Sequence, residues 1–144
     1  MSKPEPHPSR AHALEAIFAR IPMVQTIGMR CDIKGDDMVA VLPYQDKLIG
    51  NFTINSLHGC AIVTFLDFTS VAQLFLQTET PRPARPINIT VDYLRQGRAT
   101  DLFARGQVVK LGSRMASVRV EAWQSEREKP VAALLGHFLL DRGT

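Results

Sequence analysis

The sequence contains few of the residues from which metal centres and disulfide frameworks are built. Among its 144 residues there are two cysteines, Cys31 and Cys60, and four histidines. The two cysteines form no metal-binding or redox motif, so we expect no metal and two free thiols, as in a protein of the reducing cytoplasm. Aromatic residues are also few, at 7%. They do not alternate with basic residues, which argues against a nucleic-acid partner.

A hydrophobic run that would suit a lipid bilayer is also lacking. The longest apolar stretch, residues 55–77, carries His58, Asp67 and several hydroxyl and amide side chains, and no basic residues flank it. We therefore expect no membrane partner. The first nine residues are polar, rich in proline and without an apolar segment of the secretory type. We expect residues 1–9 to form a disordered tail and residues 10–144 to form one domain.

Hydrophobic periodicity divides this domain into helices and strands. The expected order is a helix at 10–20, two strands at 28–33 and 38–42 joined by a turn at 35–37, a loop at 43–54, a long helix, and four strands at 87–93, 102–111, 116–123 and 131–140. The last run is nearly all apolar, which is typical of a central strand. Strands on both sides of one long helix indicate an α+β fold whose antiparallel sheet curves around that helix. Exposed sheet edges favour pairing with a second copy.

The long helix, at about residues 56–77, is the centre of the predicted fold. Two short polar residues are candidates for its N-cap, Asn55 and Ser56. His58 and Gly59 then fall in its first turn, where free backbone N–H groups and the helix dipole favour negative charge. The helix is apolar nearly all round, so we expect other structure to surround it.

One carboxylate interrupts this apolar helix. Asp67 lies between Leu66 and Phe68, where an ionised group is costly unless it is hydrogen-bonded or functional. Asp67 could cap a neighbouring backbone group or form a buried ion pair. Because Thr64, Asp67 and Ser70 are spaced by three, they share one helix face, which favours a pocket lined by polar groups. A partly desolvated carboxylate there would be a stronger base than one in water.

Basic residues are concentrated in one segment. Between Arg82 and Arg119 there are eight basic residues and two acidic ones, although the whole chain has a net charge of only +3. These side chains could simply cover the solvated faces of strands. Alternatively they form a docking surface for a phosphorylated ligand.

The spacing of the residues around the long helix resembles that of a known family. Asn51 precedes His58-Gly59 by seven residues, and Asp67 follows His58 by nine. The stretch IGNFTINSLHGCAIVTFLDFTS resembles the signature of the PaaI-like acyl-CoA thioesterases of the hotdog superfamily. The stretch VDYLRQGRATDLFARGQVVKLGSRMASVRVEAW resembles the second half of the same family, and the similarity spans about residues 25–141.

This resemblance implies a fold, an assembly and an activity. The fold would be a hotdog, the assembly a homodimer or a dimer of dimers with its active sites at the dimer interface, and the activity hydrolysis of an acyl-CoA to a free acid and CoA. Coenzyme A would be part of the substrate, and no other cofactor is implied. The Gly59 N–H, next to His58, would be the oxyanion donor, and Asn51 would help to place the carbonyl or the water. Asp67 of the other subunit would act as nucleophile or general base.

The resemblance also implies where the CoA part of the substrate binds. The CoA-binding residues that it implies are Tyr93, Arg95, Arg98, Lys110, Ser113 and Arg114. Thr64 and Ser70, which share a helix face with Asp67, are further candidates for contact with the substrate.

Three positions depart from the family pattern. Cys60 replaces a second glycine, Gln96 replaces a proline, and Pro86 stands where some relatives have a serine. Cys60 keeps a second reading open, in which a non-catalytic hotdog protein binds acyl-CoA. A hotdog hydratase or dehydratase is a third reading, but the position of Asp67 resembles the thioesterases better.

Overall fold

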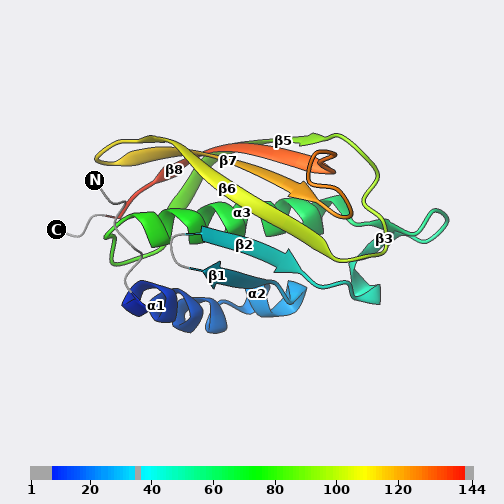
Figure 1. Cartoon of the computed structure of the whole chain (residues 1–144), viewed down its shortest axis with the longest axis horizontal. Helices are drawn as coiled ribbons and strands as arrows, with labels where there is room; N and C mark the ends of the chain where they lie inside the picture. Colours follow the sequence, from blue (N-terminus) through cyan, green and yellow to red (C-terminus); the bar gives the residue numbers. More distant parts are fainter. Residues whose placement is uncertain (1–7, 35–36, 142–144) are drawn as a thin grey trace.

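The computed structural model describes residues 8–34 and 37–141 (Figure 1). In chain order the elements are α1 (Pro8–Ala19), α2 (Pro22–Ile27), β1 (Arg30–Lys34), β2 (Asp37–Leu42), the 3-10 turn η1 (Asp46–Leu48), β3 (Ile49–Asn51), β4 (Ser56–Leu57), α3 (Gly59–Gln77), β5 (Arg85–Tyr93), β6 (Leu102–Leu111), β7 (Met115–Trp123) and β8 (Ala132–Leu139). Residues 1–7 of the expected tail lie outside the described residues, as do residues 35–36 of the expected turn.

Six strands form one antiparallel sheet in the order β1-β2-β6-β7-β8-β5. The expectation for the apolar run at 131–140 is confirmed, because β8 pairs with β7 on one side and with β5 on the other. Strand β5 has no second partner in the described part of the chain and forms one edge. The short strands β3 and β4 form a separate hairpin next to the start of α3.

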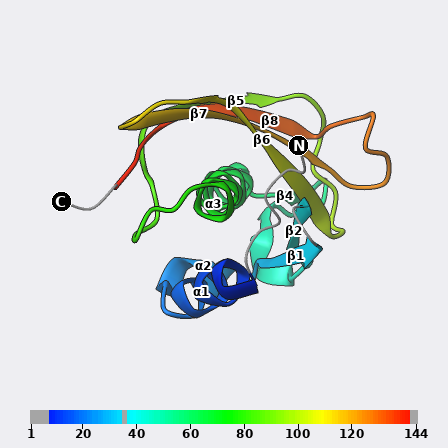
Figure 2. The ribbon, with the colours of Figure 1, turned by 60° about the vertical axis from the view of Figure 1, so that its left-hand side comes forward.

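The sheet curves around α3, as the sequence predicted (Figures 1 and 2). One side of α3 faces the sheet, and Phe65, Leu66 and Leu74 are completely buried there. Helices α1 and α2 pack below α3 on the side away from the sheet (Figure 2), where Phe18 meets Phe68 edge-to-face with ring centroids 5.9 Å apart. The length and mean hydropathy of α3 would suit a membrane span, but this apolarity is explained by its place in the protein's own core.

One local expectation was wrong. The central helix begins at Gly59 with His58 as its N-cap, and not at Asn55 or Ser56. Asn55 instead adopts a left-handed backbone conformation, with φ 49°, at the turn of the β3–β4 hairpin, and Ser56 pairs with Asn51 in that hairpin. Pro22 does end α1, but it also occupies the first turn of α2, a position where its missing N–H costs nothing.

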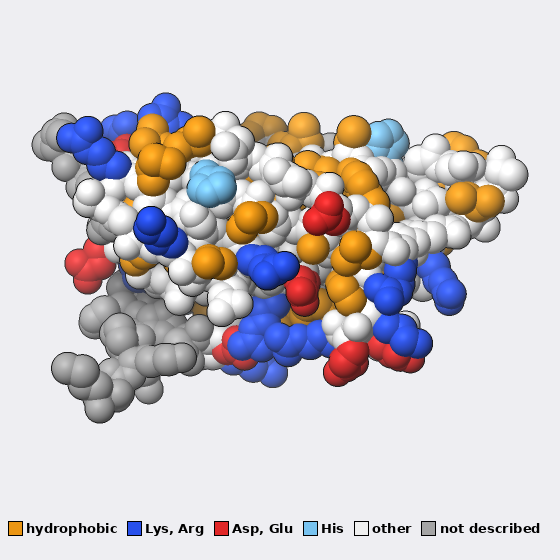
Figure 3. Space-filling model, turned by 90° about the horizontal axis from the view of Figure 1, so that it is seen from above, with side chains coloured by type: hydrophobic (Ala, Val, Ile, Leu, Met, Phe, Trp, Pro, Cys, Tyr) orange, Lys and Arg blue, Asp and Glu red, His pale blue; other side chains and the backbone are white. Residues whose placement is uncertain are grey.

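The two faces of the sheet differ in what they expose. The edge strand β5 leaves apolar and aromatic side chains open, since Tyr93 is 56% exposed on the inner face and Ile87, at a bulge in the strand, is 51% exposed. The outer face mixes hydrophobic and charged side chains (Figure 3), and its exposed hydrophobic residues include Met115, Leu135 and Leu139. Both the edge and the outer face therefore have the composition of surfaces that a further chain could cover.

Candidate active site

The start of α3 is fixed by His58. Its backbone N–H donates to the Leu48 carbonyl at 2.7 Å, and its Nδ1 accepts the N–H of Cys60 at 3.0 Å. Strand β3 passes close by, because a Cβ on Gly50 would lie 2.7 Å from the His58 Cα. This close approach brings Asn51 to the helix start, where its Oδ1 accepts the Thr53 N–H at 3.0 Å.

Gly59 presents a free N–H group at this helix start. The first N–H groups of a helix have no intrahelical acceptor. Those of Cys60 and Ile62 are satisfied by His58, but the Gly59 N–H has no acceptor within the described residues. Tyr93, at the end of β5, lies against Gly59, and its hydroxyl donates to the Gly59 carbonyl at 3.0 Å. Three predicted site residues, His58, Gly59 and Tyr93, therefore come together.

Asp67 lies two turns further along α3 and is partly buried. It forms no hydrogen bond or ion pair within residues 8–34 and 37–141, and its Oδ1 is buried without a partner. Burial raises the pKa of the Asp67 carboxyl above its ordinary value, because removal of water disfavours the charged form. A capping or ion-pairing role for Asp67 therefore has no support among these contacts.

The hydroxyls that share a face with Asp67 are used by the helix itself. Thr64 Oγ1 donates to the Cys60 carbonyl at 2.8 Å, and Ser70 Oγ donates to the Leu66 carbonyl at 3.0 Å. Ser70 is fully buried, whereas Thr64 is partly exposed. Each hydroxyl donates its hydrogen bond to a backbone carbonyl, so neither donates one to the Asp67 carboxylate.

A groove of about 1010 Å³ lies between the segment after β5 and the turn after β7. The segment after β5 forms one wall and passes the β3–β4 hairpin, where Leu57 N–H donates to the Gly97 carbonyl at 2.9 Å. Arg95 and Arg98 line this groove. Arg95 already donates to the Pro130 carbonyl at 2.8 Å, whereas the exposed Arg98 guanidinium has no partner within the described residues.

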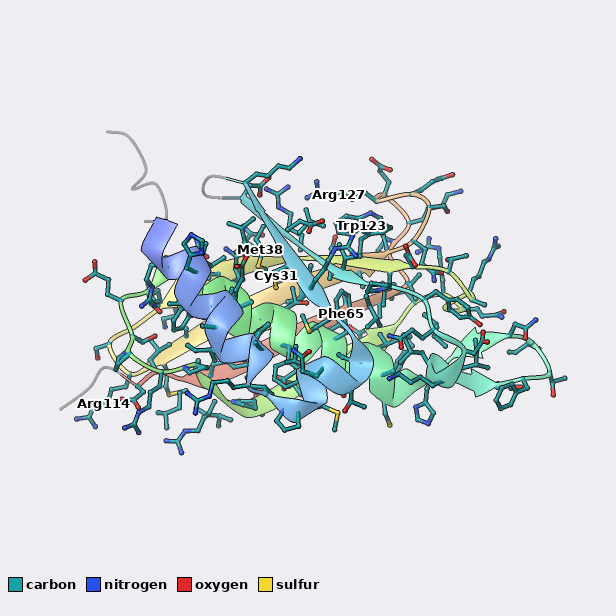
Figure 4. All side chains as sticks on the ribbon, turned by 90° about the horizontal axis from the view of Figure 1, so that it is seen from below. Cys31, Met38, Phe65, Arg114, Trp123 and Arg127 are labelled. Atoms are coloured by element: carbon teal, nitrogen blue, oxygen red, sulfur yellow. The ribbon has the colours of Figure 1, made fainter. Side chains whose placement is uncertain are left out.

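The remaining predicted CoA-binding residues lie at the other end of the sheet. Lys110 lies near the end of β6, and Ser113 and Arg114 lie in the turn between β6 and β7. Figure 4 shows Arg114 at the opposite end of the molecule from Trp123 and Arg127, which lie near the groove. Within one chain these residues do not converge with Arg95 and Arg98.

Sequence reasoning missed two features of this groove. The charged turn after β7 forms its second wall, with Lys129 and Glu126 paired at 3.4 Å. Gln124 joins the two walls by accepting the Arg98 N–H and donating to the Arg98 carbonyl, both at 2.9 Å. No spacing in the sequence links Gln124 to Arg98, since the two meet only through the fold.

No group of three His, Cys, Asp or Glu side chains suited to a metal ion occurs in the described ranges.

The architecture has close counterparts among solved structures. A protein from Chromobacterium violaceum is 30% identical, over 92% of this chain and 93% of its own, with a TM-score of 0.73. A thioesterase family protein from Silicibacter pomeroyi has a TM-score of 0.81 at 22% identity, covering 93% of this chain and 99% of its own. The PaaI protein of the E. coli phenylacetic acid degradation operon has a TM-score of 0.78 at 21% identity, covering 94% and 96%. No curated protein matches the chain.

A curved antiparallel sheet around one long helix, similar to these structures, defines a hotdog-fold protein. The family model described as "Thioesterase superfamily" matches residues 54–131, which is more than half of the chain, so the chain belongs to the thioesterase superfamily. The matched range contains the helix start, Asp67 and the wall with Arg95 and Arg98. Membership of this superfamily indicates thioester hydrolysis as the chemistry.

Proposed function

We propose that the protein hydrolyses an acyl-CoA thioester to the free acid and CoA. The observation that carries this proposal is a pair of unsatisfied groups on α3. The Gly59 N–H at the helix start can donate, and the buried Asp67 carboxylate can accept. A donor for a developing oxyanion and a base with a raised pKa are the two parts that hydrolysis of a thioester carbonyl needs.

In this reaction the thioester carbonyl oxygen accepts a hydrogen bond from the Gly59 N–H, at a helix start where the helix dipole also favours negative charge. Asp67 then acts in one of two ways. As a general base it takes a proton from a water whose oxygen adds to the carbonyl carbon, and the C–S bond breaks to release CoA as the thiolate. As a nucleophile its own oxygen adds to the carbonyl carbon, and the C–S bond breaks to release CoA as the thiolate and leave a mixed anhydride. Water then cleaves this anhydride to the free acid and restores the Asp67 carboxylate.

The proposed site needs a second copy of the chain. Eight residues of helix separate Gly59 from Asp67, which is about 12 Å along the axis, too far for both to reach one carbonyl carbon. Pairing two chains through the edge strand β5 would bring Asp67 of one chain towards Gly59 of the other, as the resemblance implies. The exposed hydrophobic side chains of β5, such as Ile87, support this edge as the contact.

The groove between the segment after β5 and the turn after β7 is the proposed place for the phosphates of CoA. Arg98 supports this, since its guanidinium is exposed, unpaired within the described residues, and on the wall that begins beside Tyr93. Charge-assisted hydrogen bonds from arginine suit phosphate oxygens. Salt should weaken this part of the binding because exposed charges are screened.

The experiment is a panel of acyl-CoA thioesters of different chain length and aromaticity, with release of the CoA thiol as the readout. We expect turnover by the wild type and a loss of about 10²–10⁴-fold in kcat for Asp67→Asn, the scale of a positioned base. Asp32→Asn is the matched control, because Asp32 is exposed on β1 at the far edge of the sheet. Its kcat should equal that of the wild type.

Three other outcomes would contradict the proposal. Binding of acyl-CoA without release of thiol would indicate a non-catalytic acyl-CoA-binding protein. Addition of water to an enoyl-CoA would indicate a hydratase. Retention of more than about a tenth of wild-type kcat by Asp67→Asn, well outside the scale of a positioned base, would remove Asp67 from the chemistry.

A further inference from the structure

We infer that Tyr93 is a positioning residue, whose hydroxyl holds the Gly59–Cys60 peptide so that the neighbouring Gly59 N–H stays directed at the substrate carbonyl. This inference rests on the proposed function. It assigns Tyr93 a different task from the CoA contact that the resemblance implies, and the two tasks can be separated by experiment.

The Gly59–Cys60 peptide is held at both ends by side chains. At one end its carbonyl oxygen accepts the Tyr93 hydroxyl at 3.0 Å. At the other end its N–H, which belongs to Cys60, donates to His58 Nδ1 at 3.0 Å. Tyr93 comes from β5, 34 residues away in sequence, so the edge strand and the helix start are fixed to each other at this peptide.

The preceding peptide, which carries the free Gly59 N–H, is fixed as well. Its carbonyl, from His58, accepts the Ile62 N–H at 3.2 Å, the first bond of the helix. Gly59 therefore lies between two peptide planes that are each held by hydrogen bonds, and its N–H cannot turn without breaking one of them. A donor fixed before the reaction stabilises a developing oxyanion most, because no reorganisation is needed as the charge forms.

Contact with Tyr93 also explains why residue 59 is a glycine. A Cβ at Gly59 would meet three Tyr93 atoms first, with Oη at 3.2 Å, Cζ at 3.4 Å and Cε1 at 3.6 Å. The φ of Gly59 is not in the left-handed region, so the backbone there does not require glycine. Burial, with a smaller contribution from nearby Cys60, raises the pKa of the Tyr93 hydroxyl, which keeps it protonated and able to donate.

The test is Tyr93→Phe, which removes the hydroxyl and keeps the ring. We expect kcat to fall by about 3- to 30-fold with little change in KM, because a loosened donor loses part of the 10²–10³-fold that a whole oxyanion donor contributes. The control is Thr26→Val. It removes a hydroxyl that also donates to a backbone carbonyl, that of Pro22 at 2.9 Å, but in α2, and it should leave kcat and KM unchanged.

A double-mutant cycle provides a second readout. Gly59→Ala introduces a methyl group that must displace the Tyr93 hydroxyl, so it should lower kcat by the same route. The losses of Gly59→Ala and Tyr93→Phe should therefore not multiply, and the double variant should be about as active as the slower single variant. Losses that multiply would mean that the two residues act separately, which would overturn the inference.

The outcomes distinguish this inference from the proposed function. A wild type that releases no thiol from any acyl-CoA would overturn the proposed function, and the inference with it. An active wild type whose Tyr93→Phe variant has a raised KM and an unchanged kcat would assign Tyr93 to CoA binding instead. Loss of melting temperature with both kinetic constants unchanged would leave Tyr93 a purely structural contact, and the inference would again be wrong.

Discussion

The Asp67 carboxyl lies in surroundings that favour its neutral form. Its Oδ1 is buried without a partner in the described part of the chain, and burial raises its pKa. A group whose pKa is raised on folding binds its proton more tightly in the folded state. Ionisation of Asp67 therefore destabilises the folded protein as the pH rises above the ordinary carboxyl value of 3.8.

We predict that Asp67→Asn is more stable than the wild type at neutral pH although it is inactive. The neutral amide avoids the buried charge, so its melting temperature should be higher at pH 7, and the difference should shrink as the pH falls towards 3.8. Wild-type kcat should follow the same ionisation and rise with pH through the raised pKa. The measurement is melting temperature against pH for both proteins. A lower melting temperature of Asp67→Asn at pH 7 would make Asp67 a structural residue.

The chemistry-bearing residues of the site were easier to predict than their partners. His58 and Gly59 were expected in the first turn of the long helix, and the structure places them at its start. That His58 would act as the N-cap was not predicted, because Asn55 and Ser56 are also good caps by type. Only the hairpin they form decides against them. The contact between Tyr93 and Gly59 depends on tertiary structure alone.

At the scale of elements, α3 is held at its two ends by residues from elsewhere. Its last turn has no basic residue of its own, and the last carbonyls of a helix have no intrahelical donors. Arg10 from α1 supplies donors. Its guanidinium bonds the carbonyls of Phe75, at 2.6 Å, of Thr78, and of Thr80, at 3.1 Å. It also lies 3.9 Å from the centre of the Phe75 ring. The amino-terminal helix therefore acts as a C-cap for the central one.

We predict that Arg10→Ala lowers the free energy of unfolding by about 1.5–3 kcal/mol, the usual contribution of hydrogen bonds to a charged group. Arg10→Lys should recover only part of this loss, because an ammonium group cannot reproduce the planar fork of donors. Arg20→Ala is the control, since Arg20 is exposed and its side chain forms no hydrogen bond or ion pair in the described ranges. Chemical denaturation measures all three. Equal stability of Arg10→Ala and Arg20→Ala would contradict the capping role.

Long elements were predicted well and short ones poorly. The four strands after α3 lie within a few residues of their expected positions, because alternation over eight or more residues is a strong signal. Helix α2 and the strands β3 and β4 are between two and six residues long, too short for a period to show. Their conformation is set by tertiary contacts such as the approach of Gly50 to His58.

At the scale of the whole molecule, the strand register explains how the separated candidates could form one site. Arg85 of β5 pairs with Leu139 of β8, which in turn pairs with Met115 of β7. The β6–β7 turn, with Arg114 in it and Lys110 just before it, therefore lies at the Arg85 end of β5. Gly59 lies at the Tyr93 end. Antiparallel pairing of two β5 edges about a two-fold axis would place the Arg85 end of one chain beside the Tyr93 end of the other. The proposed dimer thereby brings both groups of basic residues towards each site.

Shared sites predict complementation between two inactive chains. Asp67→Asn lacks the base, and Gly59→Val, whose branched side chain cannot fit against Tyr93, disrupts the oxyanion donor. Each alone should be inactive. In a mixed dimer one site combines an intact Gly59 with an intact Asp67, so mixing the unfolded chains equally and refolding them should restore about a quarter of wild-type activity for random pairing of two-fold dimers. Mixing each variant with itself is the control. A mixture that forms dimers but stays inactive would mean that no site combines Gly59 of one chain with Asp67 of the other. The proposed dimer site would then be wrong.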